Sequence, residues 1–301
     1  MVVDGYEVNV CYTAKMTTKK SKHHLIGAHV SSAGGVFNAP LRAAEEGCEV
    51  FQFFTRSPQG GKAPELTKEI IADFYKNVEA AQLVRWYTHA PYFVNTGTSE
   101  ARNRMYTLEV LRGEVERGCA LGVTGMMFHP GSTGGREDRF EAYKEANKVM
   151  NEILDGYKGS CKFLIENAAG AGSVIGAGFT EVGILWKGLK HKAKAGICLD
   201  VQHAFASGYD WRTEAGLNAM LKEFDELVGL EHLVVVHAND SMVEFNARRD
   251  RHQHIKQGKI GAAAFTRLVN HPKLKHADFI CETPADKRKE DVAFLKKVRK
   301  G

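Results

Sequence analysis

The stretch Ala195-Gly196-Ile197-Cys198-Leu199-Asp200-Val201-Gln202-His203 joins an apolar run to a carboxylate and, three residues later, a histidine. The run from Ala195 to Leu199 predicts a short buried strand, with Asp200 where the strand gives way to a loop. In a parallel α/β protein this position lies at the carboxyl edge of the sheet, where functional sites are built. A carboxylate and an imidazole are ligands of the kind that hold Zn²⁺ or Mn²⁺. One such pair is weak evidence, and its value comes from the same arrangement recurring along the chain.

Short runs of apolar, β-branched and aromatic residues alternate with stretches at helical spacing. The predicted strands are 25–30, 49–54, 84–88, 125–128, 162–165, 195–199, 233–236 and 278–281, and the predicted helices include 64–81, 99–121, 140–154, 214–228 and a basic helix at the end of the chain. Continuously apolar strands indicate burial on both faces, as in a parallel sheet. Eight such units predict an α/β protein of one domain, a closed (β/α)₈ TIM barrel, better than a doubly wound open sheet. No GxGxxG or Walker pattern supports a nucleotide-binding open sheet.

The composition is that of an ordinary soluble protein. The chain has 301 residues, of which 44% are hydrophobic and 26% charged, and its net charge of +5 permits a polyanionic partner without requiring one. No stretch of the sequence approaches the roughly 20 consecutive apolar residues of a membrane span, and the N-terminal residues lack a signal-peptide pattern. We therefore expect a cytoplasmic protein, associated with the nucleoid if prokaryotic. Free thiols are the expected state of the six scattered cysteines, Cys11, Cys48, Cys119, Cys161, Cys198 and Cys281.

Residues 1–24 lie outside the repeating pattern, so we expect a disordered extension before a barrel domain over 25–301. Met16 is an alternative start. The basic run at 19–24 is expected to be a solvated tail rather than a contact to DNA.

Metal-ligating residue types recur where the predicted strands end: His89, His129, Glu166, Asp200, His237 and Glu282. A single histidine after a strand is usually structural, and a single glutamate can cap a helix or form an ion pair. Three imidazoles and three carboxylates at one end of a barrel would repel or desolvate one another unless cations neutralised them. Histidine together with carboxylates favours Zn²⁺ or Mn²⁺ over Mg²⁺ or Ca²⁺.

A second group lies in the loop Arg249-Asp250-Arg251-His252-Gln253-His254. Asp250 and His252 are two residues apart, so in an extended loop their side chains share a face, and His203 could supply a third ligand. The alternative is a surface loop of mixed charge. For His254 a supporting or structural role is as plausible as ligation.

The chain resembles endonuclease IV, the zinc-dependent family of apurinic/apyrimidinic endonucleases. The resemblance is carried by GAHVSSAGG (27–35), THAPYFVNTG (88–97), FHPGS (128–132), IENAAGAG (165–172), CLDVQHAFASGYD (198–210), HANDS (237–241), RDRHQHI (249–255) and CETP (281–284), which occur in the family's order over nearly all of 25–284.

The resemblance implies a site of three Zn²⁺ ions, one of them replaceable by Mn²⁺, that cuts the phosphodiester 5′ to an abasic site. By motif, His89, His129 and Glu166 correspond to the ligands of one ion; Glu166, Asp200, His237 and Glu282 to those of a second; and His203, Asp250 and His252 to those of the third. The ions would activate water and stabilise the charge on the phosphate and the leaving 3′-oxygen. Glu166 would bridge two ions, and Glu282 would orient or deprotonate the attacking water. The implied partner is double-stranded DNA with abasic sites, bound by a monomer as part of base excision repair.

For DNA binding the resemblance implies Tyr92, which would enter the duplex, Arg56 or Gln59, which would fill the gap in the base stack, and Arg251. A place in the core is the alternative for Tyr92. The sequence departs from the family's pattern at Gln202, which could crowd His203, at Ala238, and at 256–258, where Lys-Gln-Gly replaces a Gly-x-Gly turn.

Two other classes of protein stay open. A sugar isomerase or epimerase of the xylose isomerase-like superfamily shares the fold but needs neither the third ligand set nor Tyr92. A DNA-damage binder without catalysis would not need a complete ligand set. Metal content separates them, since the nuclease needs about three ions per chain and an isomerase one or two.

Overall fold

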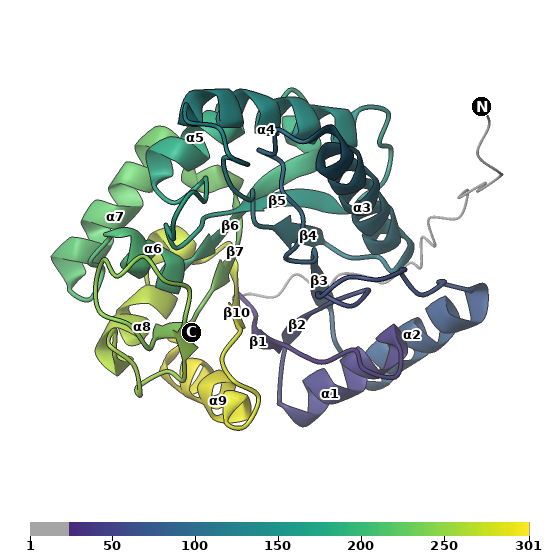
Figure 1. Ribbon diagram of the computed structural model, residues 1–301. Coiled ribbons are helices and arrows are strands. Elements are labelled where there is room, and N and C mark those ends of the chain that lie inside the picture. Colours follow the sequence, from purple (N-terminus) through teal and green to yellow (C-terminus); the bar gives the residue numbers. More distant parts are fainter. Residues whose placement is uncertain (1–23, 301) are drawn as a thin grey trace.

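Eight parallel strands close into a barrel in the computed structural model, which describes residues 24–300 (Figure 1). They are β1 (Ile26–His29), β2 (Val50–Phe53), β3 (Arg85–His89), β4 (Gly125–Phe128), β5 (Lys162–Glu166), β6 (Ala195–Asp200), β7 (Leu233–His237) and β10 (Asp278–Cys281). Around the barrel the order is β1-β10-β7-β6-β5-β4-β3-β2, so β10 closes the ring against β1. The predicted TIM barrel is confirmed.

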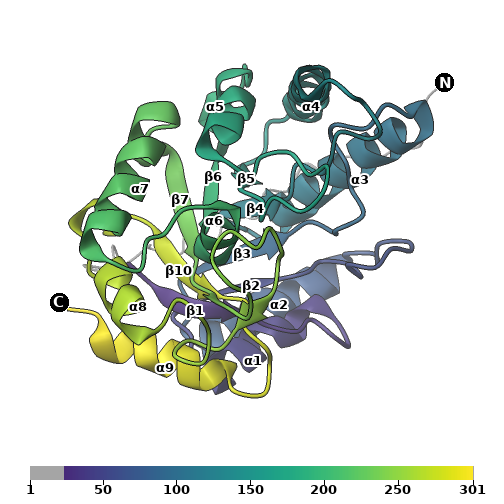
Figure 2. The ribbon, with the colours of Figure 1, turned by 60° about the vertical axis from the view of Figure 1, so that its left-hand side comes forward.

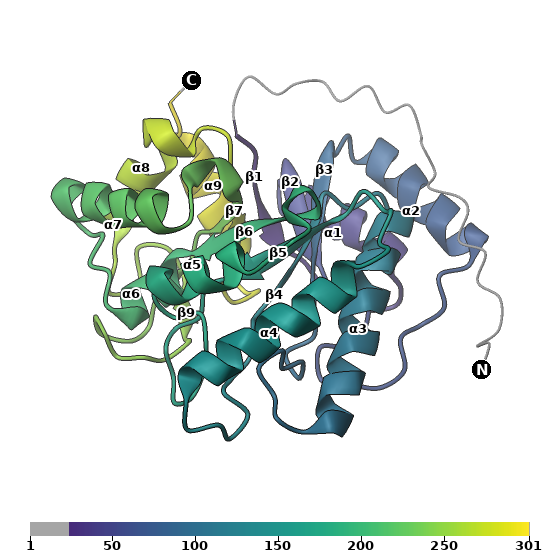
Figure 3. The same ribbon diagram turned by 90° about the horizontal axis from the view of Figure 1, so that it is seen from above.

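Helices surround this ring. They are α1 (Ala39–Glu45), α2 (Lys68–Ala80), α3 (Ala101–Ala120), α4 (Arg139–Leu154), α5 (Phe179–Lys187), α6 (Val201–Ser207), α7 (Glu214–Leu227), α8 (Ala262–Val269) and α9 (Arg288–Val298). Figure 3 shows α3, α4 and α5 side by side along one flank. Short 3-10 turns, η1 (Val36–Asn38), η2 (Lys192–Lys194), η3 (Leu230–His232) and η4 (Pro272–Leu274), join several elements. A two-stranded hairpin of β8 (Asp240–Ser241) and β9 (His252–Gln253) lies between β7 and α8, beside α6, in the yellow-green part of Figure 2.

The core has two parts because the barrel strands bury side chains on both faces. The larger part fills the space between strands and helices, including the stacked rings of Phe128 and Phe163. The smaller part is a separate cluster that includes Val50, Tyr87 and Met127, which pack with Leu164, Cys198, Val235 and Ile280. Such layers fill a small barrel, so chemistry is confined to its rim.

Several elements differ from the predictions. Asp200 is followed by helix α6 at once, and not by a loop; its carboxylate caps that helix by accepting a hydrogen bond from the His203 N–H. Helix α2 begins at Lys68 instead of 64, because Thr67 supplies the N-cap by accepting from the Ile70 N–H. Helices α5 and α8 were not among those predicted.

The predictions for residues 1–23, including Met16 and Cys11, lie outside the described residues. His24, placed in the predicted extension, is buried, with its ring 4.9 Å from that of Phe279. Within residues 24–300 the cysteines form no disulfide, as expected. No helix in this range is long and apolar enough to cross a membrane.

Candidate metal centre

The six predicted ligands at strand ends meet at one end of the barrel, here called the mouth. His89, Glu166, Asp200 and His237 are the last residues of β3, β5, β6 and β7, and His129 and Glu282 come directly after β4 and β10. Because all eight strands are parallel, their carboxyl ends lie on the same rim.

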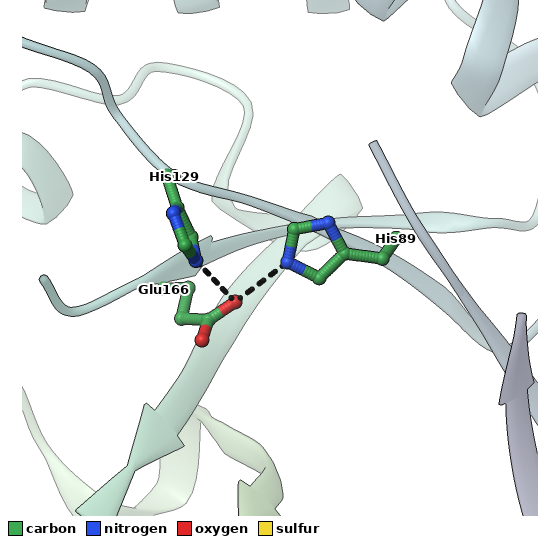
Figure 4. Close-up of side chains that lie close together, drawn as sticks. All are labelled: His89, His129 and Glu166. Atoms are coloured by element: carbon green, nitrogen blue, oxygen red, sulfur yellow. Dashed lines mark hydrogen bonds and ion pairs between the residues drawn. The ribbon is translucent and has the colours of Figure 1, made fainter. Parts of the chain in front are cut away.

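The first ligand group joins two histidines through one carboxylate (Figure 4). Oε2 of Glu166 lies 3.1 Å from His89 Nε2 and 3.5 Å from His129 Nε2. Both the Glu166 carboxylate and the His89 ring are buried, whereas the His129 side chain keeps 26% of its surface exposed. The three ligand atoms lie close enough together to hold one ion.

The second group is built around His237 and shares Glu166 with the first. His237 Nδ1 lies 3.0 Å from Glu166 Oε1, 3.2 Å from Glu282 Oε2 and 3.8 Å from Asp200 Oδ2. Three carboxylates therefore converge on one ring nitrogen. Glu166 contributes one oxygen to each of the first two groups, which is the arrangement of a bridging ligand.

The third group combines residues of α6 and the β8–β9 hairpin. Asp250 lies between two imidazoles, with Oδ2 3.3 Å from His203 Nε2 and Oδ1 3.3 Å from His252 Nε2. Asp200 Oδ2 is 3.5 Å from the same His252 nitrogen. Asp250 and His252 thus lie side by side. The ligand atoms that lie within 4.8 Å of one another here are those of Asp200, His203 and His252, so Asp200 connects this group to the second.

The ring nitrogens show that these residues fit metal ions. Nδ1 of His89 lies 2.6 Å from the Ala90 carbonyl oxygen, and Nδ1 of His203 lies 2.8 Å from that of Asn167. A proton on each Nδ1 is donated to the carbonyl, which leaves Nε2 as a ligand atom. Nε2 of His203 and of His252 are buried, and although each lies 3.3 Å from an Asp250 oxygen, neither makes a well-directed hydrogen bond in the described part of the chain. An ion at these nitrogens would supply the missing partner.

The charges of the mouth compensate one another. Burial acts to raise the pKa of Glu166, but the positive charges of His237 and His129 outweigh it and hold that pKa well below its usual range. Burial acts to lower the pKa of His203, but the charges of Asp200 and Asp250 raise it well above its usual value. The Glu166 carboxylate is therefore favoured in its charged form, which is the form that binds a metal ion.

Four polar residues without a predicted role orient the ligands. Gln52 Nε2 donates to Glu282 Oε1 at 2.6 Å, and its Oε1 lies 2.8 Å from His237 Nε2. Asn239 donates to Asp200 Oδ2 and accepts from the Glu282 N–H. The remaining two are Asn167, which pairs with the backbone of Asp200, and His29, with Nδ1 3.1 Å from Glu282 Oε1. Gln52 had a signal in the sequence, since it is the polar residue inside the apolar run Val-Phe-Gln-Phe-Phe.

The predicted DNA-binding residues lie around the mouth. Tyr92 is 57% exposed, and its ring centre is 5.4 Å from that of His89 and 5.8 Å from that of His129, so it is not a core residue. Arg56 packs over the Phe93 ring, and Gln59 is exposed in the same loop. Arg251 is exposed beside the third group.

His254, Gln202 and Lys256 each have a structural explanation. His254 pairs with Asp291 and Asp286, away from the ligand groups. The Gln202 amide donates to Ser241 Oγ and to the Arg249 carbonyl, which ties α6 to the hairpin loop. Lys256 adopts a φ of 82°, so the turn keeps a left-handed residue without the usual glycine.

A TIM barrel with such carboxylate and imidazole groups at its mouth defines a candidate metal-dependent enzyme. Residues 40–298 match the family model described as "Xylose isomerase-like TIM barrel". A protein of Halothermothrix orenii named "Probable endonuclease 4" is 35% identical over 276 residues, which cover 91% of this chain and 99% of that protein. The "Apurinic-apyrimidinic endonuclease" of Caenorhabditis elegans is 33% identical over 93% of this chain and 71% of its own length.

Among solved structures, endonuclease IV from Thermus thermophilus superposes with a TM-score of 0.77 at 33% identity, covering 90% of this chain and 96% of that one. The chain therefore belongs to the endonuclease IV family of xylose isomerase-like TIM barrels.

Proposed function

We propose that this protein is an apurinic/apyrimidinic endonuclease, which hydrolyses the DNA phosphodiester 5′ to an abasic site and leaves a 3′-hydroxyl, as a step of base excision repair. The observation that carries the proposal is the convergence of three ligand groups, linked by Glu166 and Asp200, in the mouth of a barrel whose relatives are named endonuclease 4. A cytoplasmic monomer acting on double-stranded DNA is the proposed form.

Three Zn²⁺ ions, or two with Mn²⁺ at one site, are the proposed cofactors. His89, His129 and Glu166 would hold the first, and the second would lie among Glu166, Asp200, His237 and Glu282. The third would be held by His203, Asp250 and His252, with the Asp200 carboxylate nearby. When bound, such ions activate water for attack and neutralise charge on a phosphodiester.

The chain's own groups would prepare the reaction. Glu282 reaches the mouth with 11% of its side chain exposed and is held by Gln52 and by the Asn239 amide oxygen at its backbone N–H. A carboxylate fixed in this way can orient an attacking water and accept its proton. Tyr92 stands exposed over the first group, where its ring could enter a duplex and hold a displaced nucleotide. Arg56, Gln59 and Arg251 would contact DNA around it.

The test uses a duplex labelled at its 5′ end and carrying one tetrahydrofuran analogue of an abasic site, with Zn²⁺ or EDTA. The analogue cannot undergo β-elimination, so a cut directly 5′ to it that leaves a 3′-hydroxyl establishes hydrolytic incision. No cut with Zn²⁺ restored would overturn the proposal and favour a sugar isomerase or epimerase. A metal content of one or two ions per chain would support that alternative.

Glu166→Gln tests the bridging role. The variant keeps the shape of the side chain but removes the charge shared by two groups, so we expect loss of zinc and a fall in the incision rate of at least about 100-fold. Glu181→Gln on α5 is the control, because Glu181 is a partly buried carboxylate that accepts from backbone N–H groups but belongs to none of the three ligand groups. Incision by Glu166→Gln at the wild-type rate would contradict the assignment.

A further inference from the structure

Asp240, directly after the ligand-orienting Asn239, is a fully buried carboxylate that belongs to none of the three ligand groups. It accepts five backbone N–H groups: those of Ser241 (2.8 Å) and Ile260 (2.9 Å) at Oδ1, and those of Lys256 (3.1 Å), Gly258 (3.3 Å) and Gly261 (3.2 Å) at Oδ2. Four of the five donors belong to the segment 256–261, called here the anchored turn. A carboxylate with this many N–H donors replaces the backbone partners that a helix or sheet would provide.

The anchored turn depends on this side chain. Two further backbone N–H groups of the turn have other acceptors, since Gln257 donates to the His254 carbonyl and Lys259 donates to the Ser241 carbonyl. Without the Asp240 carboxylate, four buried or half-buried N–H groups would lose their acceptor, and each such loss is costly away from water.

The shape of the turn also follows the carboxylate. A Cβ atom on Gly258 would lie 2.4 Å from Asp240 Oδ1 and 2.6 Å from the Ser241 carbonyl oxygen, so no side chain fits there. Lys256 is held at a φ of 82°, in the region that favours glycine, and its N–H points to Asp240 Oδ2. Strained backbone of this kind persists only when its surroundings impose it.

The turn leads directly back to the third ligand group. Asp240 lies in β8, which pairs antiparallel with β9 so that Ser241 faces His252 and Asp240 faces Gln253. The Met242 N–H donates to the Arg251 carbonyl one step further along the hairpin. The segment that carries Asp250 and His252 is therefore connected to Asp240 twice. It is connected at its start through β8 and at its end through the anchored turn.

A second anchor exists on the other side. Asp291 of α9 accepts from the Ile255 N–H at 2.9 Å and from His254 Nδ1 at 2.7 Å. It fixes residues 254–255 to the last helix but makes none of the contacts to the anchored turn. Backbone bonds to α6 and the Gln202 contact to the Arg249 carbonyl hold the segment before β9. Asp240 anchors the segment after β9 on the side of β7 and β8, where the other ligands lie.

We propose that Asp240 is a positioning residue that sets the third metal site, by holding the anchored turn so that Asp250 and His252 face His203. The inference rests on the proposed function, since the third ion belongs to that site. Asp240 contacts no ligand atom of the third group directly, and it acts through the backbone.

The experiment compares Asp240→Asn with Asp278→Asn in the full chain. Asparagine turns one acceptor oxygen into an NH₂ group that would face backbone N–H donors. Asp278 is a matched control because it is equally buried and accepts from the Leu25 N–H, Arg85 and Tyr87, but lies at the opposite end of the barrel. The zinc content of each protein is measured after gel filtration, and hydrogen exchange is followed in the metal-free proteins.

For Asp240→Asn we expect a third Zn²⁺ bound about 10- to 100-fold more weakly, so that zinc content falls from three towards two per chain. The amides of Lys256, Gly258, Ile260 and Gly261 should lose protection in the metal-free variant. Asp278→Asn should lower the melting temperature and keep three ions. Gly258→Ala is the second variant, to be used if Asp240→Asn does not fold. Its methyl group crowds the carboxylate without removing it, and we expect the same loss of zinc.

The outcomes separate the two proposals. Three tightly bound ions in both Asp240→Asn and Gly258→Ala would overturn the inference and leave the proposed function standing. Equal loss of zinc in the Asp278→Asn control would also overturn it, because general destabilisation would then explain the effect. Fewer than three ions on the wild-type chain would overturn the proposed trinuclear site and, with it, the inference.

Discussion

Each buried histidine of the mouth has one ring nitrogen bound outside the ligand groups. For His89 and His203 this is Nδ1, which contacts a backbone carbonyl, and Nε2 faces the carboxylates. His237 is reversed, because Gln52 Oε1 lies 2.8 Å from Nε2 and Nδ1 faces Glu166. A partner of this kind selects the tautomer and the ring orientation, which are as necessary for ligation as the residue type.

Gln52→Met tests this role at the residue scale. Methionine fills a similar volume but offers no acceptor to His237 and no donor to Glu282, so the second ligand group loses its orientation. We expect the affinity for zinc and the rate of incision to fall by about 10- to 100-fold, with the pH profile of the rate displaced. Metal titration and the pH–rate profile are the measurements.

The matched comparison is Gln52→Glu, which retains an acceptor for His237 but loses the donor to Glu282. It should recover part of the zinc affinity. Wild-type zinc affinity in Gln52→Met would show that the His237 ring is held by its other contacts.

At the scale of elements, helix α3 fixes the loop between β2 and α2 that carries Arg56 and Gln59. Arg117 donates to the carbonyl oxygens of Thr55 (2.8 Å) and Pro64 (2.7 Å), near the two ends of that loop. Its Nε donates to Thr55 Oγ1, which in turn donates to the buried Glu114. One guanidinium therefore holds both ends of a predicted DNA-binding loop.

Arg117→Lys should weaken DNA binding more than catalysis. A lysine ammonium cannot reproduce the fork of donors, so the loop loses its fixed ends, and we expect KM for abasic duplex to rise several-fold with kcat little changed. Steady-state kinetics measure this split.

Arg112→Lys is the control on the same helix. Arg112 also donates to two backbone carbonyls, those of Ile153 and Asp155, but on the side towards α4. An equal rise of KM in both variants would contradict a specific role for Arg117.

At the amino end of the barrel, Glu49 connects the start of β1 to the segment that follows α9. It accepts from the Ile26 N–H at 3.0 Å and from both terminal nitrogens of Arg299, which follows α9. Burial acts to raise the pKa of Glu49, but the Arg299 guanidinium and the Ile26 N–H outweigh it and lower that pKa.

Because the folded-state pKa of Glu49 is depressed, its stabilisation is present above the unfolded value near 4.5 and is lost as the pH falls through the folded value. Glu49→Gln should lower the free energy of unfolding at pH 7 by about 1–2 kcal/mol. The difference from the wild type should shrink below pH 4, as measured by urea denaturation across pH. A constant difference at all pH values would show that the charge is not responsible.

At the scale of the whole molecule, the ligands come from β3 to β10, and no short segment contains a complete group. Metal binding should therefore stabilise the entire barrel. An ion present at 100 times its Kd contributes about 2.7 kcal/mol per site, which corresponds to roughly 5 °C or more in melting temperature.

We accordingly expect EDTA to lower the melting temperature by at least about 5 °C and Zn²⁺ to restore it. Calorimetry or circular dichroism with and without chelator measures the shift. Identical melting curves would be inconsistent with ions held between several strands.

Much of this molecule was predictable because its determinants are local. Apolar runs such as 195–199 form strands buried on both faces, and the helical spacing between them leaves the parallel barrel as the arrangement that buries both. The strand-end positions of His89, Glu166 and His237 follow from the same pattern, since a parallel barrel brings its carboxyl ends together. The family resemblance added the grouping of the ligands and the proposed substrate.

Tertiary structure decided what depends on contacts between distant segments. Gln52 lies 185 residues from His237 in sequence, and Asp240 acts through N–H groups up to 21 residues later, so neither role has a local signature. The helix after Asp200, where a loop was expected, forms because the same carboxylate that faces His252 also caps its first turn. The residue types at the mouth are thus written in the sequence, whereas ring orientation and the placement of the third group arise only when the barrel closes and brings buried polar groups within hydrogen-bonding distance.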